Sequence, residues 1–254
     1  MRKIYTWHLT VRSYEIGRYG ALDNTSFINY LEESAIRAST HAGYGNEWFE
    51  SHQLLWVIRK MNVRFYTPVL VGEELECRTW VSDFRRIQSH REYEILRNGE
   101  RVLRARANWV FLDWTTLRPT RLLPEFYDAY QPSNEDLEDF LPPFTRNEQP
   151  PAPILYHRTA HYHELDKVWH VNNANYVRWA EEATHRAMQT GANSTMRIIS
   201  HEIEYKQSAQ ADDPICIKSW PHHTDSEGRM CWVHEISHST TGDIFALDSV
   251  VVQL

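Results

Sequence analysis

The sequence has no hydrophobic run that approaches the length of a membrane span, and its first residues lack the apolar core of a signal peptide. It also has few cysteines: Cys77, Cys216 and Cys231 are the three among 254 residues, and they lie far apart. An odd number of widely spaced cysteines argues against a disulfide framework and against a zinc site. We therefore expect no metal, no cofactor, no membrane attachment, and reduced cysteines in a cytoplasmic protein.

An excess of positive charge is also missing. The net charge is -7, which argues against a general nucleic-acid binder. The charge is uneven, however, because residues 85–121 contain nine arginines against four acidic residues. This segment fits either a solvated sheet face or a surface for an acidic partner, and the sequence does not decide between them. The arginines are Arg85, Arg86, Arg91, Arg97, Arg101, Arg104, Arg106, Arg118 and Arg121.

The first half of the sequence predicts one helix followed by an antiparallel sheet. Residues 24–42 carry apolar side chains at three-to-four spacing, among them Phe27 and Leu31, which is typical of an amphipathic helix. A loop is expected at 43–51. Asn98-Gly99 lies between two alternating runs and predicts a hairpin with a type I′ turn. The expected strands cover residues 6–17, 54–66, 74–81, 89–96 and 102–112.

Residues 113–156 differ from both halves, because they hold eight of the eleven prolines. We expect a long crossover over the surface, with one short helix at 124–130 and an acidic patch at 134–139. Aromatic side chains are expected to pin this crossover to the protein. They are Phe126, Tyr127, Phe140 and Phe144.

The second half repeats the first. At an offset of 149 residues, segment 29–38 aligns with 178–187, and at an offset of 140 Trp80 aligns with Trp220. Each half therefore has one helix and an antiparallel sheet, and one long helix can cover the apolar face of such a sheet. We predict an N-terminal module (1–112) with a degenerate site, a proline-rich crossover (113–156) and a C-terminal catalytic module (157–254).

Polar residues cluster where a strand-like run meets the second helix. Asp166, His170, Asn172 and Asn173 lie within eight residues. Asn172 or Asn173 can cap the helix, and the N–H groups and partial positive charge of a helix start can polarise a carbonyl group. A carboxylate and an imidazole beside it could promote attack on that carbonyl. On local pattern alone, a capped polar loop without function explains the same residues.

The repeat separates these two interpretations. At the offset of 149 residues, Asp166 aligns with Gly17 and His170 aligns with Ala21. A purely structural loop gives no reason for this asymmetry, whereas one functional site in the second half does. We therefore predict a site at residues 166–173.

Four sequence blocks carry a resemblance to a known family: R-S-Y-E-I-G (12–17), L-W-V-I-R-K-M (55–61), T-W-V-S (79–82) and E-L-D-x-x-x-H-V-N-N-A-N-Y (164–176). In order and spacing they resemble the acyl-acyl-carrier-protein (acyl-ACP) thioesterases, the plant plastid family and its bacterial relatives. The resemblance covers nearly the whole chain except the crossover. It implies an α+β fold, a tandem (double) hotdog, in which each half is a long helix packed on an antiparallel β-sheet. The lack of a transit peptide favours a bacterial version.

The resemblance implies a thioester hydrolase that releases a free fatty acid. Asp166 matches the catalytic aspartate of the family and His170 matches its histidine. Asn172 and Asn173 fall at the helix start, where a backbone N–H would meet the thioester carbonyl oxygen. Asp166 would either activate a water or attack the thioester directly, and the sequence leaves both routes open.

Two positions depart from the family pattern. Val168 stands where the family has an asparagine, and Ser208-Ala209 stands where plant enzymes have a Glu-Cys pair. No Cys–His nucleophilic mechanism is therefore expected. The third catalytic group is left open among Glu164, Glu204, His163 and Ser208.

The acyl chain is expected between helix and sheet of the first half, lined by Trp56, Ile58 and Met61. Trp169 and Tyr176 are further candidates for substrate contact. The expected partner is an ACP or CoA thioester. Acyl-chain length and homodimer formation are left open. The rival functions are an acyl-CoA thioesterase or a hydratase on the same fold, and a non-catalytic acyl-thioester binding protein.

Overall fold

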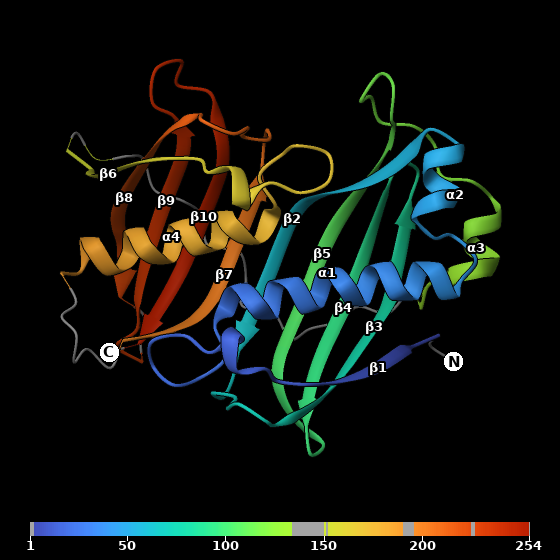
Figure 1. The fold of residues 1–254 in the computed structure, drawn as a ribbon, viewed down its shortest axis with the longest axis horizontal. Helices are drawn as coiled ribbons and strands as arrows, with labels where there is room; N and C mark the ends of the chain where they lie inside the picture. The colour runs from blue at the N-terminus through green and yellow to red at the C-terminus, as the bar shows by residue number, and fades with distance from the viewer. Residues whose placement is uncertain (1–2, 134–149, 151, 190–195, 225–226, 254) are drawn as a thin grey trace. The chain divides into compact units, whose positions relative to one another are not determined.

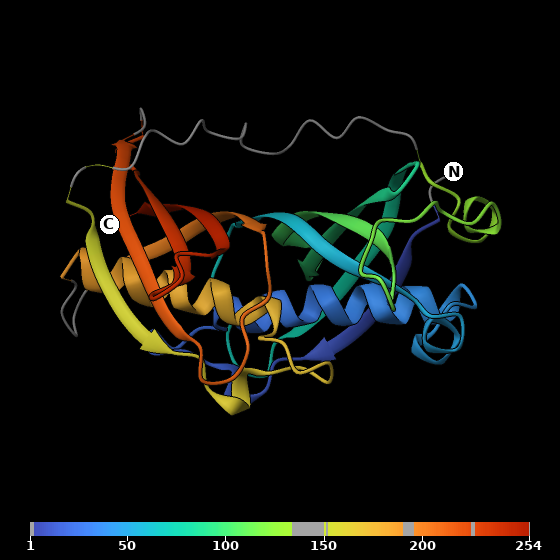
Figure 2. The ribbon, with the colours of Figure 1, turned by 90° about the horizontal axis from the view of Figure 1, so that it is seen from above.

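The structure, a computed structural model, describes residues 3–133, 150, 152–189, 196–224 and 227–253. The chain divides into two compact units, residues 1–140 (unit 1) and 141–254 (unit 2). Within the described residues, each unit has one long helix and a five-stranded antiparallel sheet (Figures 1 and 2). This confirms the predicted architecture of a helix packed on an antiparallel sheet in each half. The predicted boundaries at 112 and 156 stay a prediction.

In unit 1 the strands lie in the order β1-β3-β4-β5-β2, and each neighbouring pair is antiparallel. Helix α1 crosses one face of this sheet (Figure 1). The elements are β1 (Tyr5–Thr10), the 3-10 turn η1 (Ser13–Glu15), α1 (Asn24–His41), α2 (Asn46–Ser51), β2 (Leu54–Phe65), β3 (Glu74–Arg85), β4 (Gln88–Arg97), β5 (Glu100–Asp113) and α3 (Glu125–Tyr130).

Helix α1 begins where the sequence provides a cap and an apolar stripe. The Ser26 N–H donates to Oδ1 of Asp23 at 2.7 Å, which satisfies one of the free amides of the first turn. Phe27, Ile28 and Leu31 are at most 3% exposed and face the sheet. In the β4–β5 hairpin, Asn98 and Gly99 have φ values of 51° and 82°, as the predicted type I′ turn requires.

Unit 2 repeats this arrangement. Its strands lie in the order β6-β8-β9-β10-β7, again antiparallel throughout, and α4 packs on the sheet (Figure 1). The elements are β6 (Ile154–Thr159), the 3-10 turn η2 (Tyr162–Glu164), α4 (Asn173–Ala187), β7 (Arg197–Tyr205), β8 (Pro214–Thr224), β9 (Met230–His238) and β10 (Ile244–Gln253). Tyr176, Val177, Ala180 and Ala183 form the buried stripe of α4.

Two local expectations were wrong. The strand expected at 6–17 ends at Thr10, and the chain then turns through η1. Hydrogen bonds to the carboxylate of Glu15 hold this turn. The carboxylate of Glu15 accepts from the Arg12 N–H at 2.8 Å and from the Tyr30 hydroxyl at 2.6 Å. The loop expected at 43–51 contains the short helix α2.

The crossover contains the short helix that the sequence predicts, α3. Phe126 is fully buried and packs with Val81 and Phe111 of the sheet, so this part of the crossover is pinned to unit 1 by an aromatic side chain. Tyr127 is half exposed. The acidic patch at 134–139 and the aromatic positions 140 and 144 lie outside the described residues. In the described part of the chain, no helix is long and apolar enough to cross a membrane.

Candidate active site

The predicted site lies on a tight loop, residues 165–171, that leads from η2 into α4. Leu165 and Val171 pair as an isolated bridge, and the Asp166 N–H donates to the His170 carbonyl at 2.8 Å. The Val171 N–H donates to the Ala209 carbonyl at 2.9 Å, which anchors the loop to the turn after β7. The loop therefore holds Asp166 and His170 opposite each other through the backbone.

The carboxylate of Asp166 is exposed and oriented by its own loop. Oδ1 accepts from the N–H groups of Val168 and His170, at 2.9 and 3.2 Å. Asp166 also lines an open hollow of about 350 Å³. The other residues lining the hollow are Tyr162, His163, Leu165, Lys167 and Trp169. A carboxylate held in this way can meet a ligand in the hollow without reorienting.

His170 is half-buried and does not line the hollow. Within the described residues its link to Asp166 is made by backbone atoms and by its N–H, and its imidazole has no hydrogen bond. The structure therefore brings the two residues together in the loop but does not join their side chains.

Two asparagines with different roles lie at the start of α4: Asn172 is the N-cap, and Asn173 is the first helical residue. Asn172 is the cap, because its Oδ1 accepts from the Ala174 N–H at 2.8 Å. The Asn173 carbonyl accepts from the Tyr205 hydroxyl at 3.2 Å. The Asn173 N–H has no hydrogen-bond partner among the described residues. It is thus the amide of the first turn that can donate to an oxygen atom of a ligand.

Loop 16–22 of unit 1 has matching backbone hydrogen bonds but lacks the carboxylate and the imidazole. The Gly17 N–H donates to the Ala21 carbonyl at 2.8 Å, as Asp166 donates to His170. Ile16 and Leu22 form the matching isolated bridge. Because both loops close identically, neither the Asp166 carboxylate nor the His170 imidazole is needed to build this turn. The predicted asymmetry between the copies is therefore one of side chains on a shared scaffold.

Glu164 has a structural role in the same scaffold. Its carboxylate accepts from Arg158 at 2.7 and 2.8 Å, from Trp179 at 2.9 Å and from the His161 N–H at 2.8 Å. Burial acts to raise the pKa of this carboxyl, but these hydrogen bonds and the Arg158 charge lower it overall. Glu15 fills the matching position in unit 1, so this carboxylate belongs to both copies and does not mark the site.

The other three candidates for a third catalytic group also have defined places. His163 lines the hollow and stacks on His161, with ring centroids 5.5 Å apart. Glu204 is ion-paired with Lys206, and Ser208 is exposed. Of the four candidates, His163 is the one that shares the hollow with Asp166.

All three cysteines are buried, and none of them forms a disulfide among the described residues. Ala209 stands at the position that the resemblance gives to a cysteine in plant enzymes. It is fully buried, and its N–H donates to the Tyr176 hydroxyl at 2.8 Å. Tyr176 is itself 1% exposed, so it supports the site from the core of unit 2. Its predicted contact with substrate stays a prediction.

The candidates for the acyl-chain pocket lie on β2 of unit 1. Ile58 and Met61 are buried. Trp56 is half-buried and packs on Phe111 and Phe126, with ring centroids 4.8 and 6.2 Å apart. These side chains are apolar and closely packed, and the prediction that they line an acyl chain stays a prediction.

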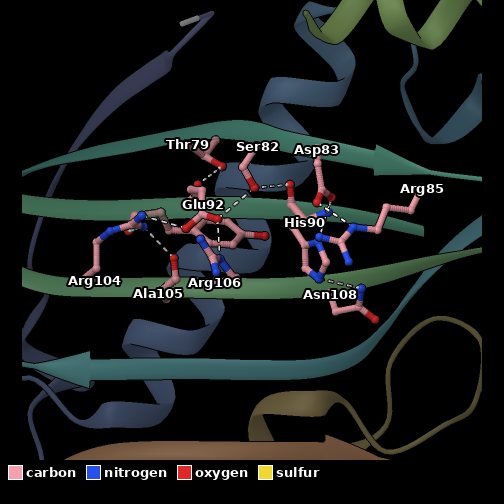
Figure 3. Close-up of polar contacts among 11 residues, drawn as sticks. Thr79, Ser82, Asp83, Arg85, His90, Glu92, Arg104, Ala105, Arg106 and Asn108 are labelled. Carbon is pink, nitrogen blue, oxygen red and sulfur yellow. Dashed lines mark hydrogen bonds and ion pairs between the residues drawn. The ribbon is translucent and has the colours of Figure 1, made fainter. Parts of the chain in front are cut away.

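Five of the nine arginines of segment 85–121 form ion pairs with carboxylates of unit 1. Figure 3 shows Arg104 and Arg106 both bound to the buried carboxylate of Glu92, at 2.7 and 2.6 Å. Arg85 pairs with Asp83 at 2.9 Å (Figure 3). Further pairs are Arg97–Glu73 and Arg101–Glu94. The segment therefore offers an acidic partner less positive charge than the sequence indicates.

The sequence did not point to two other features. Trp169 lies in the left-handed backbone region, with φ of 64°, and the alignment with Gly20 is the signal that could have revealed it. Beneath α4, His201 is buried between Asp248 at 2.7 Å and Glu181 at 3.1 Å. The signal for this second feature is a histidine at the position where the first copy has Met61.

Two family models match the chain. Residues 2–130 match the acyl-ACP thioesterase N-terminal domain, and residues 170–243 match the thioesterase superfamily. The second match begins at His170 and includes the start of α4.

Curated relatives are similar along most of the chain. The chain is 26% identical over 221 residues to the chloroplastic palmitoyl-acyl carrier protein thioesterase of Cuphea hookeriana, covering 80% of this chain and 51% of that protein. It is 25% identical over 229 residues to the chloroplastic oleoyl-acyl carrier protein thioesterase 2 of Arabidopsis thaliana, covering 83% of this chain and 61% of that protein. The chain thus spans about half the length of the curated relatives it matches.

A solved structure shares the fold of the whole chain. The 12:0-ACP thioesterase from Umbellularia californica matches with a TM-score of 0.82 and 19% identity, covering 98% of this chain and 94% of that chain. The fold is therefore the α+β double hotdog that the sequence blocks predict.

Proposed function

The chain belongs to the acyl-ACP thioesterase family, and from that premise we propose that it hydrolyses fatty acyl thioesters, with acyl-ACP as substrate, to release a free fatty acid. The observation that supports this proposal is the pair of matching loops. Loop 165–171 carries Asp166 and His170 where loop 16–22 has Gly17 and Ala21 on the same hydrogen-bonded backbone.

The proposed reaction uses the helix start as the oxyanion site. The thioester carbonyl oxygen would accept from the Asn173 N–H, at the positive end of α4. Negative charge develops on this oxygen during attack, so the contact would strengthen in the transition state. Asn172 keeps the helix start in place as its cap.

Asp166 would supply the attack. As a general base its carboxylate takes a proton from water, and the hydroxyl oxygen bonds to the carbonyl carbon. As a nucleophile it bonds to that carbon itself and gives an acyl anhydride, which water then hydrolyses. In both routes the carbon–sulfur bond breaks and the thiolate takes up a proton. His170 lies on the other side of the loop and is our candidate to donate that proton.

The first experiment is hydrolysis by the purified protein. Acyl-ACP and acyl-CoA substrates are compared over a range of chain lengths, because the relatives named above carry palmitoyl, oleoyl and 12:0 in their names. We expect hydrolysis of acyl-ACP with a higher kcat/KM than of the same acyl-CoA. A higher kcat/KM for acyl-CoA would change the proposed substrate from acyl-ACP to acyl-CoA and would leave the proposed reaction, thioester hydrolysis, unchanged.

The second experiment tests the role of Asp166. Asp166→Asn keeps the acceptor oxygen for the loop amides and removes the charge, so we expect an unchanged fold and a turnover at least about 100-fold lower. The matched control is Asp113→Asn, because Asp113 is also an acceptor for the amide of its own turn, from Thr116 at 2.8 Å. Activity of Asp166→Asn equal to that of the control would remove Asp166 from the mechanism.

A non-catalytic acyl-thioester binding protein is the second candidate. It is favoured by Val168 and Ala209, which offer no polar side chain where the family sequence blocks do. Tight binding of an acyl thioester without product release would support this candidate against hydrolysis.

We further propose that the protein acts in the cytoplasm. The support is that none of the three cysteines, all of which lie in the described part of the chain, forms a disulfide, as is usual in a reducing compartment.

A further inference from the structure

Trp169 has a backbone conformation that its side chain disfavours. Its φ is 64°, in the left-handed region that suits glycine, and large side chains rarely adopt it. The matching residue of loop 16–22 is Gly20, with φ of 75°. The hydrogen bonds also match: Trp169 N–H to the Asp166 carbonyl at 3.1 Å, and Gly20 N–H to the Gly17 carbonyl at 3.0 Å. The turn therefore requires the conformation but not the tryptophan.

The indole does not repay this cost by packing in the core. Trp169 is 65% exposed, and Tyr162 beside it is 72% exposed, with their ring centroids 6.1 Å apart. Both rings line the hollow that Asp166 lines. In unit 1 the matching positions are Gly20 and Ser13, so this pair of rings occurs only in the copy that carries Asp166. Strained residues that persist without a structural reason concentrate at ligand sites.

We propose that Trp169, with Tyr162, binds the phosphopantetheine arm that carries the acyl group on both ACP and CoA. This inference rests on the proposed function, because it assigns one part of that substrate to one part of the site.

The chemistry of the hollow favours the arm over the fatty chain. The hollow is open, has a volume of about 350 Å³ and includes the charged side chains of Asp166 and Lys167, which would leave a fatty chain wet. The arm alternates methylene and dimethyl groups with amides. Aromatic faces suit its apolar groups, while the indole N–H, the tyrosine hydroxyl and His163 can bond its amides.

The test uses Trp169→Gly, which restores the residue of the first copy. The variant removes the indole and the backbone strain together, so its stability should equal or exceed that of the wild type. The matched control is Leu117→Gly. Leu117 is also an exposed apolar residue in the left-handed region, with φ of 53° and 60% exposure, and it lies in unit 1. The control therefore removes strain and an exposed side chain without touching the hollow.

Kinetics are measured on thioesters of one fatty acid with thiols of increasing length: ethanethiol, N-acetylcysteamine, pantetheine, CoA and holo-ACP. We expect Trp169→Gly to lower kcat/KM about tenfold for the pantetheine, CoA and ACP thioesters, and to leave the ethanethiol thioester within about twofold. A loss on CoA alone would assign the indole to the nucleotide, and a loss on ACP alone would assign it to the protein. Either result, an equal loss on every thiol, or no loss on any would overturn the proposal.

Binding decides the case even if the protein hydrolyses no thioester. Calorimetry with 4′-phosphopantetheine should show an affinity that is about tenfold weaker for Trp169→Gly than for the wild type and for Leu117→Gly. Equal affinities for the three proteins, or no binding to the wild type at millimolar concentration, would overturn the assignment. Absence of hydrolysis with intact binding would overturn the proposed function alone.

Discussion

At the scale of single residues, the candidate site contains two kinds of residue: those that build the loop in both copies, and those that occur in the second copy alone. Glu164, Asn172 and the backbone hydrogen bond that closes the loop have counterparts in unit 1, which are Glu15, Asp23 and the bond from the Gly17 N–H to the Ala21 carbonyl. Asp166, His170 and Trp169 have none, since Gly17, Ala21 and Gly20 stand in their places. The residues that the second copy alone possesses are therefore the ones to which a function can be assigned.

Glu164 gives a prediction at this scale. Glu164→Gln weakens a buried carboxylate that accepts from Arg158, Trp179 and the His161 amide, so the free energy of unfolding should fall by about 2 kcal/mol. Turnover per folded molecule should stay within about threefold of the wild type. Glu15→Gln is the control, because Glu15 makes the same kind of contacts in unit 1. Denaturant unfolding and active-site titration are the measurements. Loss of turnover with unchanged stability would move Glu164 into the catalytic group.

At the scale of elements, α4 differs from α1 in what lies beneath it. His201 is buried between Asp248 and Glu181. His234 is buried between Thr184, at 2.9 Å, and Ser219, at 2.8 Å. Both histidines join α4 to its sheet through polar contacts. In unit 1, Met61 lies where the repeat aligns His201.

The two histidines predict how the stability of unit 2 depends on pH. Burial acts to lower the pKa of His201, but Asp248 and Glu181 raise it to about 10. Its contribution is complete below about pH 6.5 and is lost as the pH rises through about 10. Burial lowers the pKa of His234 to about 4, so its contribution is complete above about pH 6.5 and is lost as the pH falls to about 4. The free energy of unfolding should therefore have a maximum near pH 6.5 from these two groups.

Denaturant unfolding across this pH range measures the effect. His234→Gln, which cannot take up a proton, should flatten the acid side of the curve and leave the alkaline side unchanged. His52→Gln is the control, because His52 is an exposed histidine of unit 1. An acid side that His52→Gln flattens as much as His234→Gln would refute the assignment.

Elements were predictable from the sequence where local chemistry decides them. Asn98-Gly99 defines its hairpin because both residues accept a positive φ, and the apolar stripes define α1 and α4. The turns η1 and η2 were missed because they depend on contacts made 15 residues away, from Tyr30 to Glu15 and from Trp179 to Glu164. Local sequence patterns do not reveal contacts between residues this far apart in the chain.

The geometry of the candidate site was predictable in part for the same reason. The position of Asp166 and His170 before a helix start could be inferred from spacing, and their place in one loop is confirmed by the bond between Asp166 N–H and the His170 carbonyl. The backbone strain at Trp169 could not be inferred, because φ is a property of the folded turn. Nor could the charge pairing of Arg104 and Arg106 with Glu92, which depends on strand register.

At the scale of the whole molecule, one chain holds two copies of a helix-on-sheet unit, and one copy carries the side chains that we propose to be catalytic. The double hotdog fold and the family are shared with the thioesterases described above. We propose that loop 165–171 differs from loop 16–22 by its reacting side chains, because the backbone hydrogen bonds of the two loops match.

The most direct measurement is the rate of acyl-ACP hydrolysis by the double variant Asp166→Gly/His170→Ala, which gives the second loop the residues of the first. Because Gly17 and Ala21 close the same turn in loop 16–22, the variant should keep the fold, with a melting temperature lowered by the loss of the two amide hydrogen bonds that Asp166 accepts. Its rate should fall by at least about 100-fold, toward the uncatalysed background. A folded double variant that keeps the wild-type rate would show that Asp166 and His170 do not carry the reaction.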